Sequence, residues 1–297
     1  MDKLTLNSYA KLNLYLEVRD IRRDTYHNLI TVFERINLSD RIILKPRPDT
    51  KIKIKCTDPS VPKDKSNFCY RAAQLLQNAF KIKRGLEIEI IKRIPVAAGL
   101  GGGSSNAATL LLGLNKFWKL NLTRVKLAWF AQQIGSDVPF FVYNTAFAQG
   151  SGRGERIKAL KSLNSVQLWH ILVVPRLKIS TPFIYKKWDE MADSKGRAGL
   201  TRPKYNVKIL PSVLKKKELF STDKLLFNNL EQVTFSLYPE VERIKEEFAS
   251  LGLKSILMSG SGPAVFGIVS SRKEAVTLSR RLEKQDGSRR VFVTSTH

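Results

Sequence analysis

Cysteine and histidine are both scarce in this chain of 297 residues. The two cysteines are Cys56 and Cys69, and the three histidines are His27, His170 and His297. Their spacing matches neither a CxxC knuckle nor an HxxxH motif, and two cysteines do not make the disulfide framework of a small secreted protein. We therefore expect two reduced, structural cysteines and no metal site built by the protein itself.

A long uninterrupted apolar run is also missing from the beginning of the chain. Residues 1–18 alternate polar and apolar side chains. A signal peptide or a membrane helix needs a continuous apolar stretch instead. This pattern leads us to expect a cytoplasmic protein without a membrane partner.

Acidic residues are few: 26 Asp and Glu stand against 51 Lys and Arg, which gives a formal net charge of +25. Such a surface attracts polyanions, and it equally concentrates phosphorylated metabolites. The basic residues are scattered and lack the interleaved aromatic residues of a single-strand binding surface. We expect solvated basic faces, a small-molecule substrate and no specific nucleic acid, with an RNA-binding protein as the alternative.

The chain is long enough for two domains. With 43% hydrophobic residues it can bury a core of the size at which one core tends to divide into two. A glycine-rich stretch at residues 150–154 is the candidate boundary, which gives an N-terminal domain over 1–155 and a C-terminal domain over 156–297. The sequence leaves the oligomeric state open between a monomer and a homodimer.

Polar and apolar alternation predicts a strand-rich first half. The predicted strands cover residues 4–18, 28–37, 41–56 and 86–94, with a turn at Pro46 and Pro48. Helical patterns begin after Ser66 or Asn67, either of which is a suitable N-cap, and also cover 106–118 and 123–134.

The second half mixes strands and helices in a pattern typical of an α+β sandwich. Strands are predicted at 169–174, 255–258, 264–269 and 291–294, and helices at 180–191, 238–251 and 273–284. Residues 193–206 are predicted to form a polar loop.

A glycine-rich loop enters the apolar helix predicted at 106–118. Its glycines permit positive φ angles and close backbone approach, and the helix that follows directs free N–H groups and its positive dipole end at an anion. This combination indicates a binding loop for a polyphosphate such as ATP. The expected ATP-binding residues of the loop are Pro95, Val96, Ala97, Ala98, Gly99, Leu100, Gly101, Gly102, Gly103, Ser104 and Ser105. The two serines can cap the helix or bind phosphate and Mg²⁺, which would arrive with the nucleotide.

Two other phosphate-binding loops are excluded. A P-loop needs a lysine directly after its glycines, and the first lysine here is Lys116. A dinucleotide-binding fingerprint needs an acidic residue roughly 20 positions later, and residues 104–136 contain neither Asp nor Glu.

The glycine loop resembles the central motif of the GHMP kinase superfamily. A second motif, LMSGSGPAVFG at 257–267, is similar to the C-terminal glycine motif of that superfamily. The resemblance implies a two-domain α+β fold, with a ribosomal-protein-like N-terminal ATP-binding domain and a ferredoxin-like C-terminal sandwich. The sequences AKLNL at 10–14, Tyr26-His27 and GSDVPFF at 135–141 extend it over nearly the whole chain.

These last motifs resemble a branch of the superfamily that acts in the non-mevalonate isoprenoid pathway. Its members transfer phosphate from ATP to the 2-hydroxyl of a methylerythritol that carries cytidine diphosphate. The resemblance implies that Asp137 accepts the hydroxyl proton and that Lys11 stabilises the charges around it. Spacing alone favours a helix N-cap for Asp137 and a strand-edge lysine for Lys11, and the match to the motifs reverses that interpretation.

The same resemblance implies a cytidine pocket formed by Asn13, Tyr26, His27 and Tyr185, and places Asn67 and Lys92 near the adenosine. One position departs from the pattern, since the residue before Tyr26 is Thr25 where relatives usually have glycine. If that position needs a positive φ, a β-branched residue would be strained there. A superfamily kinase with another acceptor, such as homoserine, mevalonate or a sugar, remains the alternative within this class.

Overall fold

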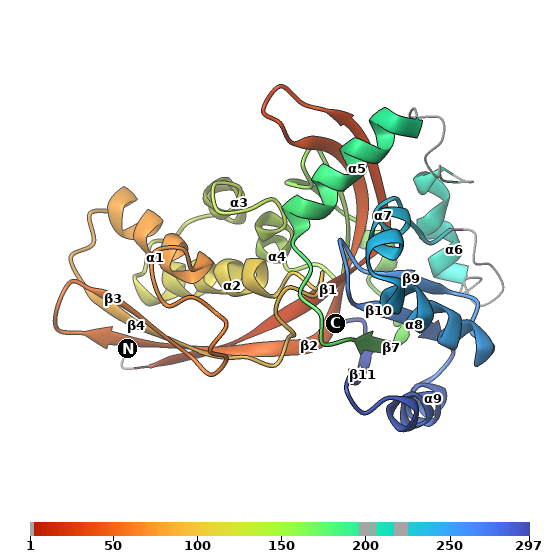
Figure 1. The fold of residues 1–297 in the computed structure, drawn as a ribbon. Helices are drawn as coiled ribbons and strands as arrows, with labels where there is room; N and C mark the ends of the chain where they lie inside the picture. The colour runs from red at the N-terminus through yellow and green to blue at the C-terminus, as the bar shows by residue number, and fades with distance from the viewer. Residues whose placement is uncertain (1–2, 196–202, 204–205, 217–224) are drawn as a thin grey trace.

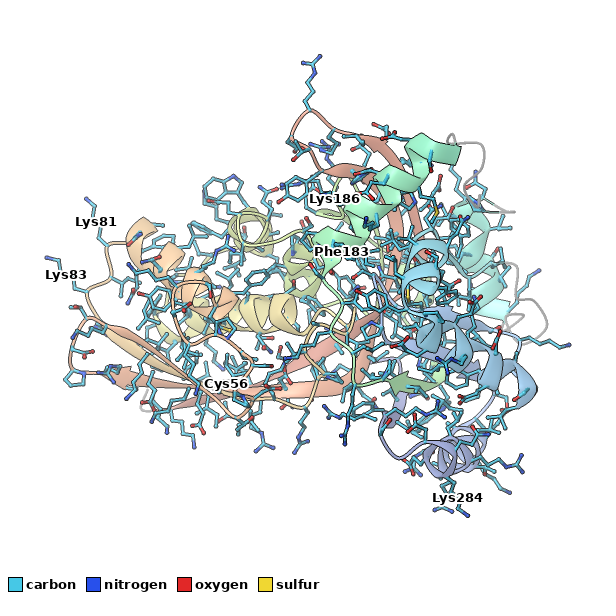
Figure 2. All side chains as sticks on the ribbon, viewed as in Figure 1. Cys56, Lys81, Lys83, Phe183, Lys186 and Lys284 are labelled. Carbon is cyan, nitrogen blue, oxygen red and sulfur yellow. The ribbon has the colours of Figure 1, made fainter. Side chains whose placement is uncertain are left out.

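Two β-sheets that share a buried core form the framework of the protein, with the second sheet at one end of the long first sheet (Figure 1). The computed structural model describes residues 3–195, 203, 206–216 and 225–297. Among these residues, no helix is both long enough and apolar enough to cross a bilayer. Basic side chains project from opposite ends of the molecule, with Lys81 and Lys83 at one end and Lys284 at the other (Figure 2).

The first sheet has seven strands and is built around a long antiparallel hairpin of β1 and β2. Its central path runs in the order β3-β4-β2-β1-β8, and β5 pairs with both β2 and β6. The strands are β1 (Leu4–Ile21), β2 (His27–Arg47), β3 (Ile52–Cys56), β4 (Gly85–Ile91), β5 (Phe147–Ser151), β6 (Arg156–Ala159) and β8 (Phe227–Asn228).

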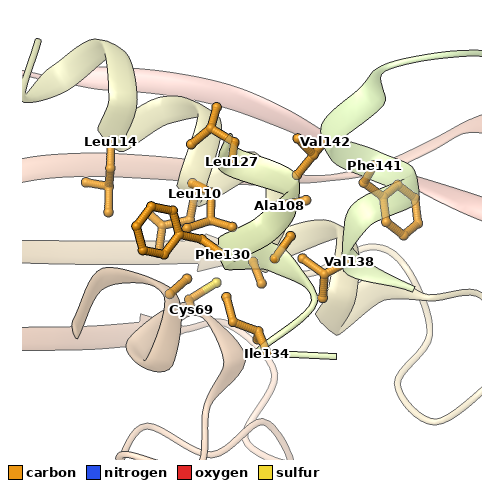
Figure 3. Close-up of a cluster of buried hydrophobic side chains, with 14 of the residues drawn as sticks. Cys69, Ala108, Leu110, Leu114, Leu127, Phe130, Ile134, Val138, Phe141 and Val142 are labelled. Atoms are coloured by element: carbon orange, nitrogen blue, oxygen red, sulfur yellow. The ribbon is translucent and has the colours of Figure 1, made fainter. Parts of the chain in front are cut away.

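Four helices cover one face of this sheet: α1 (Phe68–Ala79), α2 (Gly102–Phe117), α3 (Arg124–Ala131) and α4 (Val138–Tyr143). Their apolar residues form one buried cluster with the sheet, in which Leu110 of α2 lies among Leu127, Phe130 and Val142 (Figure 3). Cys69 belongs to the same cluster, and burial raises the pKa of its thiol to about 12. Both cysteines are free, as expected.

The second sheet is antiparallel, in the order β11-β7-β10-β9. Its strands are β7 (Trp169–Val174), β9 (Ile256–Met258), β10 (Val265–Val269) and β11 (Arg290–Ser295). This strand order is that of a ferredoxin-like βαββαβ unit, as predicted. The helices of this half are α5 (Thr181–Lys195), α6 (Leu210–Lys216), α7 (Leu230–Leu237), α8 (Pro239–Ser250) and α9 (Arg272–Gln285), with short 3-10 turns at Lys161–Leu163 and Val207–Ile209.

The side chains on the two faces of strand β1 have different surroundings. Leu12 and Leu14 point into an apolar core shared with Leu172 and Phe266 of the second sheet. Because side chains alternate along a strand, Lys11 and Asn13 point the other way. The joint core between the sheets therefore holds these two polar residues in fixed positions.

Most predicted elements are confirmed, including the strand at Trp169–Val174 and the helix capped by Asn67, whose side chain accepts a hydrogen bond from the Cys69 N–H. The predicted turn is confirmed at Pro48, where the chain bends over residues 48–50, but it does not include Pro46, because β2 continues to Arg47. Helix α2 begins at Gly102, earlier than expected, so two of the glycines lie in its first turn.

The predicted domain boundary at 150–154 lies in the hairpin between β5 and β6, so a division of the chain at residue 155 stays a prediction. Within the predicted polar loop at 193–206, residues 193–195 belong to the end of α5. Residues 196–202, 204 and 205 lie outside the described part of the chain.

The turn between β1 and β2 contains a strained residue. Thr25 has a φ of +65°, and its N–H donates to the Arg22 carbonyl over 3.1 Å. The Arg22 N–H in turn donates to the Tyr26 carbonyl over 2.7 Å. A β-branched residue is rarely found in this left-handed region, because its side chain crowds the backbone. The departure from glycine seen in the sequence thus falls at a position that favours glycine.

We expect Thr25→Gly to raise the free energy of unfolding by about 1 kcal/mol. Relief of left-handed strain contributes roughly 1–2 kcal/mol, and the greater chain entropy of glycine offsets roughly 0.5–1 kcal/mol of it. Urea unfolding of the variant and of a Thr25→Ala control measures the change. A Thr25→Gly protein less stable than the parent would show that the turn is not strained.

Candidate active site

A cleft of about 930 Å³ opens between the glycine loop, β1 and α5. It brings together residues from positions far apart in the chain. All the sequence-predicted site residues line this cleft except Ser105; they are Lys11, Asn13, Tyr26, His27, Asn67, Lys92, residues 95–104, Asp137 and Tyr185.

The glycine loop leads the chain directly into the N-terminus of α2. Gly101 is the N-cap of the helix and has a φ of +67°, and Gly99 has a φ of +75°. A Cβ on Gly99 would lie 2.0 Å from the Ser259 carbonyl oxygen, and one on Gly101 would lie 3.0 Å from Cγ of Lys11. Glycine is therefore required for backbone geometry and for space. The free N–H groups of the first turn of α2 face the cleft, an arrangement that binds anions.

The two serines of the loop have different surroundings. Ser104 lines the cleft, whereas Ser105 is buried and its hydroxyl lies 2.7 Å from the Ser8 hydroxyl. Neither serine caps α2, because the helix has already begun at Gly102. Of the two hydroxyls proposed for phosphate or Mg²⁺, the structure thus presents only that of Ser104 to the cleft.

Lys11 is the central cation of the site. It is 3% exposed, its ammonium lies 3.5 Å from the Asp137 carboxylate, and it donates a hydrogen bond to the Asn13 side-chain oxygen. Its backbone N–H also donates to the Leu100 carbonyl over 3.1 Å, which ties β1 to the glycine loop. Burial lowers the pKa of the Lys11 ammonium, and the Asp137 carboxylate offsets part of that decrease.

Asp137 occupies the N-cap position of α4, yet its side chain makes no capping hydrogen bond. The carboxylate turns instead toward Lys11 and is 33% exposed. The residues that follow it, Val138–Tyr143, pack α4 into the buried cluster between the first sheet and its helices. The carboxylate therefore projects from a rigid support. A carboxylate and an ammonium placed beside an anion-binding helix end can accept a proton and stabilise negative charge in one place.

Aromatic side chains gather at the other end of the cleft. The His27 ring lies 5.2 Å from the Tyr185 ring and edge-on to Trp188 at 5.5 Å. Its Nε2 is 2.7 Å from a carboxylate oxygen of Asp189, which fixes the ring orientation. Tyr26 is half exposed in the turn between β1 and β2.

Burial and nearby charges set the electrostatic surroundings of Tyr185 and Tyr26. Burial raises the pKa of the Tyr185 hydroxyl and the negative charge of Asp137 adds to the increase, so this hydroxyl stays protonated at neutral pH. The Arg153 guanidinium lies 4.9 Å from the centre of the Tyr26 ring, a cation–π distance. The aromatic end of the cleft is therefore neutral at Tyr185 and positively charged near Tyr26.

The two residues expected near adenosine have structural partners. The Asn67 side chain accepts from the Cys69 N–H over 2.8 Å and donates to the Pro62 carbonyl over 2.6 Å. The Lys92 ammonium pairs with the buried carboxylate of Asp40. Both side chains line the cleft while they hold the surrounding loops in place.

Sequence reasoning missed four charged side chains of this region: Asp40, Arg153, Lys186 and Asp189. Asp189 follows Tyr185 by one helical turn, a spacing that puts both on one helix face. Lys186, the residue of α5 next to Tyr185 and labelled in Figure 2, also lines the cleft. Asp40 is buried together with Ile42 and Leu44, which alternate with it along the strand. An acidic residue on the apolar face of a strand is unusual, and this feature of the sequence could have identified Asp40. Arg153 stands between two glycines and carries no comparable signal.

No group of three or more His, Cys, Asp or Glu side chains gathers as a metal site within the described ranges. The expectation that Mg²⁺ arrives with the nucleotide stays a prediction.

Two family models match the chain. The GHMP kinases N terminal domain matches residues 67–145, and the GHMP kinases C terminal domain matches residues 214–288. The first match contains the glycine loop and Asp137, and the second contains the C-terminal glycine motif.

Relatives that match nearly the whole chain point to one branch of this family. The chain is 38% identical to the 4-diphosphocytidyl-2-C-methyl-D-erythritol kinase of Gloeobacter violaceus, over 100% of this chain and 95% of the relative. It is 43% identical to the enzyme of the same name from Shouchella clausii, over 90% and 86% of the two chains.

Solved structures give the same result. The chain resembles the crystal structure of a 4-(cytidine 5'-diphospho)-2C-methyl-D-erythritol kinase with a TM-score of 0.79 and 31% identity, over 99% of this chain and 100% of the other. A homoserine kinase from Cytophaga hutchinsonii shares the fold, with a TM-score of 0.73 at 16% identity over 100% and 95% of the chains. The chain therefore belongs to the GHMP kinase family and, within it, to the family of the 4-diphosphocytidyl-2-C-methyl-D-erythritol kinases.

Proposed function

We propose that this protein transfers the γ-phosphate of ATP to the 2-hydroxyl of 4-diphosphocytidyl-2-C-methyl-D-erythritol, giving the 2-phosphate and ADP, in the non-mevalonate isoprenoid pathway. The observation that carries this proposal is the Lys11–Asp137 pair, 3.5 Å apart beside the glycine loop. The named relatives support the choice of acceptor.

The nucleotide phosphates bind at the N-terminus of α2 in this proposal. The backbone of residues 95–103 surrounds them, and the helix dipole and N–H groups of the first turn stabilise their charge. Mg²⁺ bound with ATP would neutralise part of the phosphate charge, and the Ser104 hydroxyl, which lines the cleft, is the loop side chain that would hold it. The protein contributes mainly positioning and electrostatic stabilisation.

The acceptor binds at the aromatic end. Tyr26 and Tyr185 offer ring faces for the cytosine, and His27 offers an edge whose orientation is fixed by Asp189. Stacking of a base on an aromatic side chain contributes about 1–3 kcal/mol. Arg153 and Lys186 add positive charge where a substrate with a diphosphate needs it.

The reacting hydroxyl lies between these two ends, next to Asp137. Its proton passes to the Asp137 carboxylate as the oxygen attacks the γ-phosphorus in line with the departing ADP. The Lys11 ammonium stabilises the negative charge that develops on the attacking oxygen. Asn13 holds this ammonium by accepting one of its hydrogen bonds.

A panel of acceptors tests the choice of substrate. ATP consumption should be rapid with 4-diphosphocytidyl-2-C-methyl-D-erythritol and should stay at background with homoserine, mevalonate and galactose. Only the first acceptor carries a base that the aromatic end can stack. Turnover with one of the other three acceptors, and none with the cytidyl compound, would move the protein to another branch of the family.

The Asp137→Asn variant tests the proton acceptor. We expect kcat to fall by a factor of about 10²–10⁴, the usual contribution of a general base, while the Kd for ATP changes little. Asp286→Asn, an exposed carboxylate outside the cleft, is the matched control and should keep parental kcat. A parental kcat in Asp137→Asn would remove this residue from the mechanism.

A further inference from the structure

We infer that Asp40 is a positioning residue of the nucleotide site: one buried carboxylate fastens both ends of the glycine loop. This inference rests on the proposed binding of ATP at that loop. Asp40 lies on β2, within the central sheet, and is 1% exposed. It does not line the cleft, so it would act on the nucleotide through the residues that it holds.

The first end of the loop is held through the backbone. Oδ1 of Asp40 accepts hydrogen bonds from the N–H groups of Arg93 and Ile94, over 2.7 and 2.9 Å. These two residues directly precede Pro95, where the loop begins. Hydrogen bonds to an ionised acceptor are stronger than neutral ones, and burial strengthens them further. The entry of the loop is thereby fixed to the sheet.

The second end is held through a side chain. Oδ2 of Asp40 accepts from Nδ2 of Asn106, over 2.9 Å. Asn106 lies on α2, just after the glycines and serines of the loop. The same Nδ2 lies 2.9 Å from the Ser8 hydroxyl, and Ser8 is the residue of β1 paired with Asp40 across the sheet. Two neighbouring strands thus form a polar platform beneath the first turns of α2.

The fourth partner of Asp40 is a cation of the cleft itself. Oδ2 also accepts from the ammonium of Lys92, which lines the cleft. A Cβ on Gly102 would lie 3.1 Å from that ammonium. Asp40 therefore keeps a positive charge directly beside the first residue of α2, where the phosphate-binding N–H groups begin.

These contacts predict a specific defect when the charge is removed. In Asp40→Asn the side chain keeps its shape, but an NH₂ group replaces one oxygen. Whichever way the amide turns, a donor then faces donors: either the two backbone N–H groups or Lys92 and Asn106. Both ends of the loop cannot be held at once, so the nucleotide site should loosen while the aromatic end, built from α5 and the β1–β2 turn, is unaffected.

The test separates nucleotide binding from acceptor binding. Titration calorimetry with adenylyl imidodiphosphate and Mg²⁺, without any acceptor, should show a Kd raised about tenfold or more in Asp40→Asn. The KM for the cytidyl acceptor at saturating ATP should stay within about twofold of the parent, since its contacts are elsewhere. Because no acceptor is needed for the first measurement, an unproductive acceptor panel would not affect its outcome.

Glu34→Gln is the matched control. Glu34 is also a fully buried carboxylate on β2, but it faces the second sheet, where it accepts from Thr296 over 2.6 Å and lies 3.1 Å from His170. This change should lower stability and leave the nucleotide Kd at the parental value. A purely structural role for Asp40 predicts the same outcome for both variants, so a folded Asp40→Asn protein with a parental Kd would overturn the inference.

A milder variant keeps the test decisive if Asp40→Asn does not fold. Asn106→Ala removes one of the four partners and leaves the carboxylate in place. We expect a Kd for adenylyl imidodiphosphate raised about threefold or more, in the same direction as the larger defect. A parental Kd in Asn106→Ala would then overturn the inference.

Discussion

The buried ammonium of Lys11 is the interaction on which the rest of the site depends. A charge this deep in the protein is stable only with compensating partners, because burial removes its hydration. Asn13 supplies an oxygen from the same strand, and Asp137 supplies a carboxylate from the start of α4. Since the Lys11 backbone also bonds to Leu100, one residue joins the sheet, the glycine loop and the carboxylate.

The second sheet makes this arrangement rigid. The Ser259 hydroxyl donates to the Gly99 carbonyl over 3.1 Å, and the absence of a Cβ on Gly99 permits the approach. The buried Asn228 amide donates to the carbonyls of Met258 and Gly260, over 2.8 Å each, and so fixes the loop that carries Ser259. The C-terminal glycine motif therefore supports the phosphate loop from the side of the second sheet.

The local parts of this site could be predicted from the sequence, and the long-range parts could not. Glycines before an apolar helix indicate an anion-binding turn wherever they occur, so the loop was identified without the structure. The partners of this loop could not be identified in that way, because the hydrogen bond from Arg93 to Asp40 joins residues far apart in the chain. Ser105 shows the same limit, because only the packing of α2 on β1 decides that its hydroxyl faces Ser8 and not the cleft.

The secondary structure could likewise be predicted from local patterns, whereas its long-range pairing could not. Strands and helices with clear periodicity, such as β7 and α9, agree with their sequence patterns. The pairing of β8 with β1 involves two residues of each strand and has no periodic signal, although it places Asn228 beside the loop that follows β9. Resemblance to a known family supplied what periodicity could not, namely that Lys11 and Asp137 belong to one site.

The most direct test of the account is a crystal structure with adenylyl imidodiphosphate, Mg²⁺ and the cytidyl acceptor bound together. We predict the γ-phosphate at the N-terminal turn of α2 and the acceptor hydroxyl about 2.6–3.2 Å from an Asp137 oxygen. A triphosphate bound away from the glycine loop, or a reacting hydroxyl far from Asp137, would contradict it.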